Sequence, residues 1–233
     1  MHDEIQVWQA NIADAEPFAR QLIATLSAQE RARGARFIQP EHQQQFLLAH
    51  AILRDVLSRH LDRLPEAIRY KKTSHGKPYI DDAALQFNLS HSQDCVVVAV
   101  SREHELGVDV ENTQREVDCD ALVKRFFSAE ENDEYLSYST PEARRLAFYR
   151  GWTRKEAYVK AIGLGLSYPL SNFSVSLLPD ERRALYNVEG DASVADKWTV
   201  ISMDLGGNYL SSLAVAASVV NLKTYQWSFC PSS

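Results

Sequence analysis

The residues best placed for chemistry are two carboxylates at the end of an apolar run, Asp109 and Glu111 in the stretch Gly107-Val108-Asp109-Val110-Glu111. The composition of this stretch predicts a buried strand, in which alternate side chains share a face. The two carboxylates then point the same way and the two valines point into the core. Carboxylates on one face repel each other unless a cation lies between them, and hard divalent metals prefer such oxygen ligands.

A third carboxylate follows in the segment from Trp152 to Lys160. If this segment is helical, Glu156 and Lys160 are four residues apart and share a face. Asp109, Glu111 and Glu156 with a lysine beside them predict a three-carboxylate metal site suited to chemistry on a phosphate. The alternative is a solvated Asp-x-Glu turn followed by an ordinary surface helix.

Two stretches upstream carry groups that bind phosphate. In the loop His75-Gly76-Lys77-Pro78, glycine and proline shape a turn that would aim the ammonium of Lys77 at an anion. The stretch from Leu85 to Ser92 alternates like a strand and ends in polar residues, of which Ser90 and His91 could donate to phosphate oxygens. A hairpin turn with an exposed histidine is the alternative for this second stretch.

The elements that position these residues predict an α+β fold. Capping boxes at Ser27 and Ser128 begin helices, a long helix runs from Glu41 to Leu61, and Pro141 opens another that Gly163 ends. The expected strands cover residues 5–10, 96–100, 106–110, 173–177, 198–202 and 210–220. Each half therefore carries strands and a long helix, with a break between Ser101 and Leu106 and no sequence repeat.

Composition limits the class of protein. With 45% hydrophobic residues among 233 and a net charge of −6, the chain has ample material for a core and no basic excess for nucleic-acid binding. The odd set of three cysteines, Cys95, Cys119 and Cys230, fits a reducing compartment. The chain shows no signal peptide and no run of about 18 apolar residues, so we expect a soluble cytoplasmic protein without a membrane segment.

Five motifs, taken together, resemble a known family. They are Gly76-Lys77-Pro78, Phe87 to Ser92, Gly107 to Glu111, Phe127 to Glu131 and Trp152 to Ala157. In this order and spacing they closely resemble the 4'-phosphopantetheinyl transferases of the larger, two-half type that activates surfactin synthetase, over roughly residues 25 to 175. The resemblance implies two similar α/β halves with pseudo-twofold symmetry, at 1–103 and 104–233, with coenzyme A and magnesium bound between them.

The resemblance also implies a reaction. The phosphopantetheinyl arm of coenzyme A moves to a serine of an apo acyl or peptidyl carrier protein, and 3',5'-ADP is released. The implied roles are Mg²⁺ ligation by Asp109, Glu111 and Glu156, deprotonation of the serine by Glu156 or a water it orients, pyrophosphate contacts by Lys160, Ser90 and His91, and contact with the nucleotide end by Lys77.

The chain departs from the family where relatives often place a basic residue for the 3'-phosphate of coenzyme A. Here Gln43-Gln44-Gln45 precedes Phe46. Arg31, Arg33 or Arg36 would then take over that contact, although these arginines also fit a solvated basic face.

The carrier protein needs a docking surface, for which the segment after the metal strand is the best candidate. Arg115, Lys124 and Arg125 supply charge, and Phe126 and Phe127 supply an apolar anchor, unless the two aromatic residues are core.

Two other functions compete with the transferase. One is a metal-dependent hydrolase of a nucleotide or pyrophosphate, and the other is an inactive coenzyme A-binding scaffold. Because both halves are present in one chain, a single copy is sufficient to form the site, and we expect a monomer.

Overall fold

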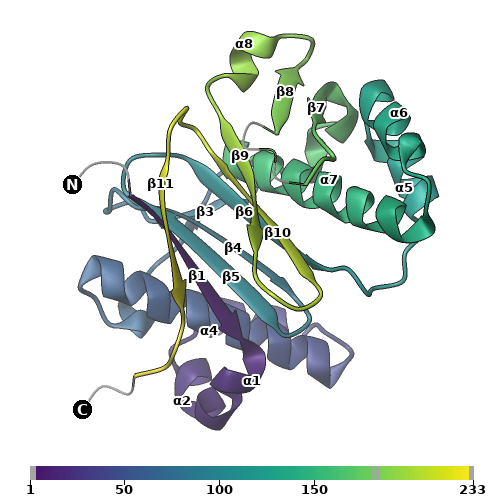
Figure 1. Cartoon of the computed structure of the whole chain (residues 1–233). Coiled ribbons are helices and arrows are strands. Elements are labelled where there is room, and N and C mark those ends of the chain that lie inside the picture. The colour runs from purple at the N-terminus through teal and green to yellow at the C-terminus, as the bar shows by residue number, and fades with distance from the viewer. Residues whose placement is uncertain (1–3, 180, 182–183, 231–233) are drawn as a thin grey trace.

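The computed structural model describes residues 4–179, 181 and 184–230. Two sheets, each covered by one long helix, form the body of the molecule (Figure 1). The first half contains β1 (Glu4–Asn11), α4 (Pro40–Leu61), β4 (Gln86–Ser92) and β5 (Cys95–Ser101), and the second contains β6 (Leu106–Asn112), α7 (Pro141–Ile162), β9 (Thr199–Asp204) and β10 (Tyr209–Val215). The shorter elements are α1 (Ile12–Ala15), α2 (Ala19–Ala24), α3 (Ala28–Gly34), β2 (Lys71–Lys72), β3 (Pro78–Tyr79), α5 (Cys119–Phe126), α6 (Ala129–Ser137), β7 (Phe173–Val175), β8 (Leu185–Val188), α8 (Ala192–Ala195) and β11 (Asn221–Gln226).

The two long helices are built alike. Each has 22 residues and begins with a proline, whose missing N–H costs nothing in the first turn. Each is followed by a residue in the left-handed conformation, Asp62 with φ 51° and Gly163 with φ 73°. The α+β class is confirmed, and the duplicated architecture is present although no repeat is visible in the sequence.

The strand β5 lies between two layers of core. Val96, Val98 and Val100 pack towards α4, whereas Val97 and Ala99 pack towards β6 and β10 of the other sheet. An uninterrupted apolar run is what a strand buried on both faces requires. The layers therefore run helix, sheet, sheet, helix, and α7 covers the outer face of the second sheet.

The two sheets meet along a polar seam between the edge strands β4 and β6. Alternate side chains of β4 accept hydrogen bonds from alternate backbone N–H groups of β6. The acceptors are Asn88 Oδ1, Ser90 Oγ and Ser92 Oγ, and their donors are Val108, Val110 and Asn112, at 3.0, 3.3 and 3.1 Å. The polar alternation of β4 thus joins the halves and sets the position of the strand that carries Asp109.

The end of the chain returns to the first half. β11 pairs in parallel with β1 and appears in yellow beside it in Figure 1. Trp227 is fully buried in the first core, and its indole Nε1 donates to Asp55 Oδ2 at 2.8 Å. The last strand of the expected second half, 104–233, thus fills the free edge of β1 in the sheet of the first half. The division expected after residue 103 falls between β5 and β6.

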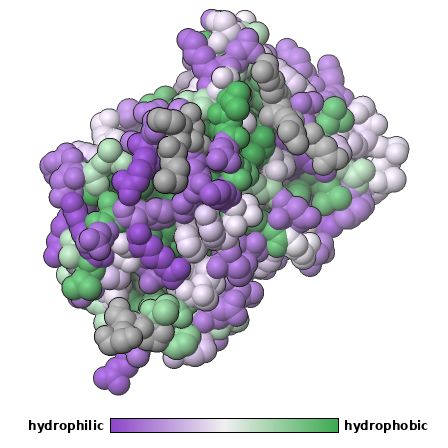
Figure 2. Space-filling view, turned by 60° about the vertical axis from the view of Figure 1, so that its left-hand side comes forward, coloured by the Kyte–Doolittle hydropathy of each residue, from purple (hydrophilic) through white to green (hydrophobic). Residues whose placement is uncertain are grey.

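Within the described ranges, no helix is long and apolar enough to span a lipid bilayer. Hydrophilic residues cover most of the face shown in Figure 2, and hydrophobic ones gather near its middle.

Candidate active site

The close approach of β6 to α7 depends on Gly107. A Cβ at this position would overlap the carbonyl oxygen of Ala157 and the backbone nitrogen of Ala161. Only glycine permits this contact between backbones. Since Asp109 is two residues further along the strand, its side chain faces α7 as Gly107 does.

Asp109 is buried, at 4% exposed, and its two oxygens differ. Oδ1 accepts from Lys160 Nζ at 2.5 Å and from Ser90 Oγ at 2.9 Å. Oδ2 is buried and has no hydrogen-bond partner among the residues the structure describes. A buried carboxylate oxygen without a partner is costly, and a bound cation would remove that cost.

Two further carboxylates interact with Asp109. Burial, together with the charges of Asp109 and Glu111, raises the pKa of Glu156 to about 7, although Lys160 opposes the shift. Burial and the charge of Asp109 also raise the pKa of Glu111, whose Oε2 accepts from Ser92 Oγ at 3.2 Å. Asp109, Glu111 and Glu156, called the carboxylate cluster below, thus lie near enough for their charges to act on one another.

This cluster is not a closed metal-binding shell. Among the described residues, no three His, Cys, Asp or Glu side chains are close enough to form a ready metal site. The donor set nevertheless fits a hard divalent ion, because all three side chains offer oxygens and Asp109 Oδ2 has no partner in the part of the chain that the structure describes. The three carboxylates are the residues that would hold such an ion.

A cavity of about 770 Å³ opens beside Lys160. Its volume lies within the usual range for sites that bind cofactor-sized ligands. Polar groups from both halves line it, including Arg33, Arg69, Lys72, Ser90, His91 and Lys160. Burial and the charge of Lys160 lower the pKa of His91, and an anion bound beside the imidazole would raise it.

Three residues that were predicted to contact coenzyme A, Lys77, Arg31 and Arg36, do not line this cavity. Lys77 Nζ donates to the carbonyl oxygen of Ala161 at 2.6 Å, as expected for a cation at a helix C-terminus. The neighbours of Lys77 line the cavity, but Lys77 does not. Arg31 donates to the carbonyl oxygen of Leu26, and Arg36 is exposed outside the cavity wall. Among the three arginines proposed from the sequence, only Arg33 lines the cavity.

Arg69 and Lys72 were missed in the sequence analysis. Both lie just before the Gly76-Lys77-Pro78 turn, and the only signal for them was the run of basic residues from 69 to 72. Their side chains became candidates only when the fold placed this segment against α4 and β4.

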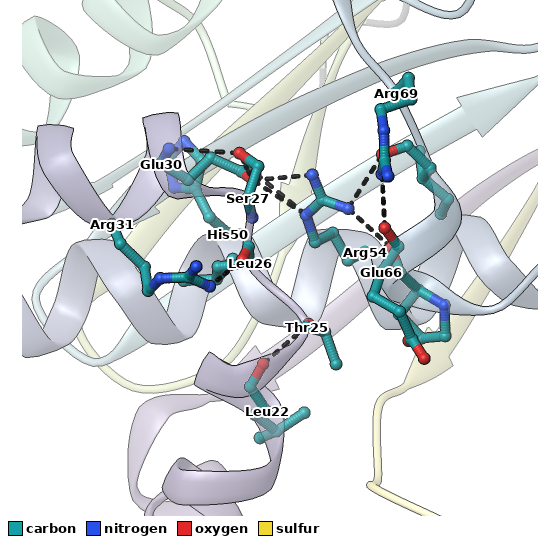
Figure 3. A network of polar contacts seen from close by, with 12 residues as sticks. Leu22, Thr25, Leu26, Ser27, Glu30, Arg31, His50, Arg54, Glu66 and Arg69 are labelled. Carbon is teal, nitrogen blue, oxygen red and sulfur yellow. Dashed lines mark hydrogen bonds and ion pairs between the residues drawn. The ribbon is translucent and has the colours of Figure 1, made fainter.

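A buried arginine holds this part of the wall in place (Figure 3). Arg54 reaches from α4 to Glu30 of α3, with Nη2 at 2.7 Å from Oε2. Its Nη1 donates to the carbonyl oxygens of Pro65 and Ile68 at 2.6 and 3.1 Å. Arg54 therefore ties the helix that carries Arg33 to the segment that carries Arg69.

An equivalent buried pair anchors α7. Lys155, next to Glu156, is fully buried and pairs with Glu131 of α6 at 2.8 Å. Its ammonium also donates to the carbonyl oxygens of Leu170 and Phe173, both at 2.7 Å. These contacts fix the rotation of α7 and so the direction of Glu156.

The expected docking segment is only partly exposed. Phe127 is 4% exposed and stacks on Phe148, so its proposed role as an apolar anchor is wrong. It follows the last residue of α5 and closes the core under α7. Phe126 is half-buried against Trp152, whereas Lys124 and Arg125 are exposed.

Arg115 lines a second cavity, of about 820 Å³. Glu111 and Ser92 line it too, and it shares Phe37 and His91 with the first. The two cavities therefore meet beside the carboxylate cluster.

Comparison with known proteins places both halves in one family. The sequence model described as the 4'-phosphopantetheinyl transferase superfamily matches residues 105–216. The model described as 4'-phosphopantetheinyl transferase, N-terminal, matches residues 8–103.

Individual relatives agree with these matches. The 4'-phosphopantetheinyl transferase HetI of Nostoc sp. is 34% identical over 220 residues, which cover 93% of this chain and 89% of that protein. The putative 4'-phosphopantetheinyl transferase slr0495 of Synechocystis sp. is 32% identical, covering 88% of each. The 4'-phosphopantetheinyl transferase Sfp of Bacillus subtilis is 35% identical over 66% of this chain and 68% of its own length. With both halves matched and a relative aligned over almost its whole length, this chain belongs to the 4'-phosphopantetheinyl transferase family.

Proposed function

We propose that this protein transfers the 4'-phosphopantetheine arm of coenzyme A to a serine of an apo acyl or peptidyl carrier protein, with Mg²⁺ as cofactor and 3',5'-ADP as the second product. The observation that supports this most is the unpartnered Oδ2 of Asp109. The same carboxylate contacts Lys160 and Ser90, which line the first cavity, and shares a strand face with Glu111, which lines the second.

Coenzyme A carries charge in two places, the pyrophosphate and the 3'-phosphate, and the first cavity offers cations in two places. Lys160, His91 and the hydroxyl of Ser90 bind the pyrophosphate next to the carboxylates. Arg33, Arg69 and Lys72, from the other wall, bind the 3'-phosphate. In this proposal they replace the basic residue that the run Gln43-Gln44-Gln45 lacks.

The chemistry needs a proton acceptor and neutralisation of charge. The serine oxygen attacks the phosphorus of the pantetheine phosphate, a new P–O bond forms, and the bond to the 3',5'-ADP oxygen breaks. Glu156 takes the serine proton, directly or through one water molecule; in the metal-free protein burial and the charges of Asp109 and Glu111 raise its pKa to about 7. Lys160 stabilises the charge on the leaving phosphate. Mg²⁺ held by Asp109, Glu111 and Glu156 would neutralise the pyrophosphate.

The cysteines support a reducing location for this reaction. Cys95, Cys119 and Cys230 are all free thiols, and burial raises the pKa of Cys95 to about 12, as suits an inert core residue. We therefore place the enzyme in the cytoplasm. We also propose that it acts as a monomer, because the two halves of one chain complete the site.

Mass spectrometry of apo carrier proteins incubated with the enzyme, coenzyme A and Mg²⁺ tests the proposal. We expect the carrier to gain one phosphopantetheine and an equal amount of 3',5'-ADP to appear. Consumption of coenzyme A without any carrier would show a hydrolase instead. Tight binding without any product would show a scaffold.

A further inference from the structure

The two cavities offer different chemistry to their ligands. The first contains the cations Arg33, Arg69, Lys72 and Lys160, which suit the phosphates of the donor. The second has four carboxylates in its wall, those of Glu16, Glu41, Asp94 and Glu111, against the single guanidinium of Arg115, so its lining is acidic on balance. A phosphate would be repelled there, whereas a serine hydroxyl would not. The second cavity is therefore the side from which the acceptor approaches.

An apolar segment stands at the junction of the two cavities. Phe37, which lines both, is 40% exposed, and Ile38 beside it is 98% exposed. Both lie in the connection between α3 and α4, next to the start of α4 at Pro40. A large aliphatic side chain kept almost wholly in water, at the mouth of a site that must receive a protein, indicates a contact surface.

Unpaired positive charge flanks this segment. Arg36, the residue before Phe37, is exposed, and its guanidinium forms no ion pair or hydrogen bond within the described ranges. Arg115 lies across the second cavity, is also exposed, and makes only backbone hydrogen bonds to the rest of the described chain. The surface around Ile38 is thus apolar at its centre and cationic beside it.

We propose, resting on the function proposed above, that the apo carrier domain docks on this surface through Ile38, with Arg36 and Arg115 meeting acidic side chains around its acceptor serine. The chain carries a net charge of −6, so an acidic carrier would be repelled on average and needs a local cationic surface. The acidic wall of the second cavity keeps the charged surface of the carrier at the rim and admits only the neutral hydroxyl. The apolar anchor is therefore Ile38 of the first half, in place of Phe127.

Substitutions at the rim test this proposal, with Val219→Asp as the matched control. Ile38 and Val219 are both highly exposed aliphatic residues, at 98% and 79%, so neither change disturbs the core. Ile38→Asp should raise the carrier KM about tenfold, as expected for an interface anchor, with kcat and the coenzyme A Kd unchanged. Arg36→Glu should raise the carrier KM and flatten its dependence on salt.

The outcomes separate this proposal from the proposed function. If Ile38→Asp behaves like Val219→Asp while both still modify the carrier, the docking surface is elsewhere and the transferase function stands. If the unmodified enzyme transfers nothing to any carrier, the proposed function itself fails. If Ile38→Asp weakens coenzyme A binding instead, the segment belongs to the donor site and the docking proposal is wrong.

Discussion

The ammonium of Lys160 lies 2.5 Å from Oδ1 of Asp109, while Oδ2 of the same carboxylate is buried without a partner among the described residues. One oxygen is thus neutralised by the protein, and the other is the oxygen that we propose binds Mg²⁺. The shared helix face of Glu156 and Lys160 was expected from the sequence, but the contact of Lys160 with Asp109 on the neighbouring strand was not. The lysine reaches from α7 to β6, and its ammonium also donates a hydrogen bond to Ser90 Oγ of the first half at 3.0 Å.

Replacing Asp109 with Asn should abolish metal-dependent activity while preserving the fold. The substitution removes a ligand charge, and a loss of several kcal/mol of transition-state stabilisation corresponds to about a thousandfold in rate. Thermal unfolding with and without Mg²⁺ and coenzyme A should show that the ligands no longer stabilise the variant. Asp133→Asn, at an exposed carboxylate on α6, is the control. Normal turnover of Asp109→Asn at ordinary Mg²⁺ would rule out this metal site.

Replacing Lys160 with Met should lower both activity and the stability of the metal-free protein. The change leaves a buried carboxylate without its cation, which costs about 1–3 kcal/mol. Lys223→Met is the matched control, because Lys223 also pairs with a carboxylate at 2.5 Å but the pair is largely exposed. An exposed pair contributes only about 0–1 kcal/mol. Equal changes in melting temperature for the two variants would show that Lys160 does not stabilise the buried carboxylate of Asp109.

Replacing Gly107 with Ala should destabilise the protein and disrupt the site together. The added methyl group would meet backbone atoms of α7, which cannot move aside as a side chain can. Overpacking of this kind costs about 1–3 kcal/mol or more. Gly34→Ala is the control, because its methyl group would meet the side chains of Leu47 and Phe46 and no backbone atom of another element. Chemical denaturation measures both, and a smaller loss for Gly107→Ala than for Gly34→Ala would show that β6 and α7 are not in close contact.

Local patterns in the sequence predicted much of this structure. The alternation in Gly107 to Glu111 predicted the strand and the shared face of its carboxylates, because that periodicity follows from the backbone alone. Both capping boxes, at Ser27 and Ser128, form the two reciprocal hydrogen bonds expected of them. Periodicity also placed Asp109 with Glu111 on one face of the strand and Glu156 with Lys160 on one face of the helix, but the meeting of strand and helix was expected from the family resemblance.

Contacts set by distant segments could not be predicted in this way. Lys77 sits in a turn that suits an anion, but the fold brings the C-terminal carbonyls of α7 within its reach. Phe127 follows an exposed basic pair, yet the packing of α7 decides that it is buried. β11 pairs with β1 more than two hundred residues before it in the chain, and no local pattern specifies that partner.

The last prediction concerns pH. Burial and the charge of Asp109 raise the pKa of Glu156 from its usual 4.5 to about 7, so the folded protein holds this proton more tightly than the unfolded chain does. Stability contributed by the protonated form is present at low pH and is lost as pH rises from the unfolded pKa through the folded one. Glu156→Gln has no proton to lose, so its melting temperature relative to the metal-free native protein should rise between about pH 5 and about pH 8.

Adding Mg²⁺ should cancel this advantage at the higher pH, because a bound cation stabilises the ionised carboxylates of the native protein but finds a weaker site in Glu156→Gln. Thermal unfolding of both proteins across this range, with and without Mg²⁺, measures the effect. Glu134→Gln provides the comparison, as a carboxylate outside the cluster whose oxygens accept from the backbone N–H of Leu177. If the gap between Glu156→Gln and the native protein does not change with pH, Glu156 is ionised throughout this range and its pKa is not raised in the folded protein.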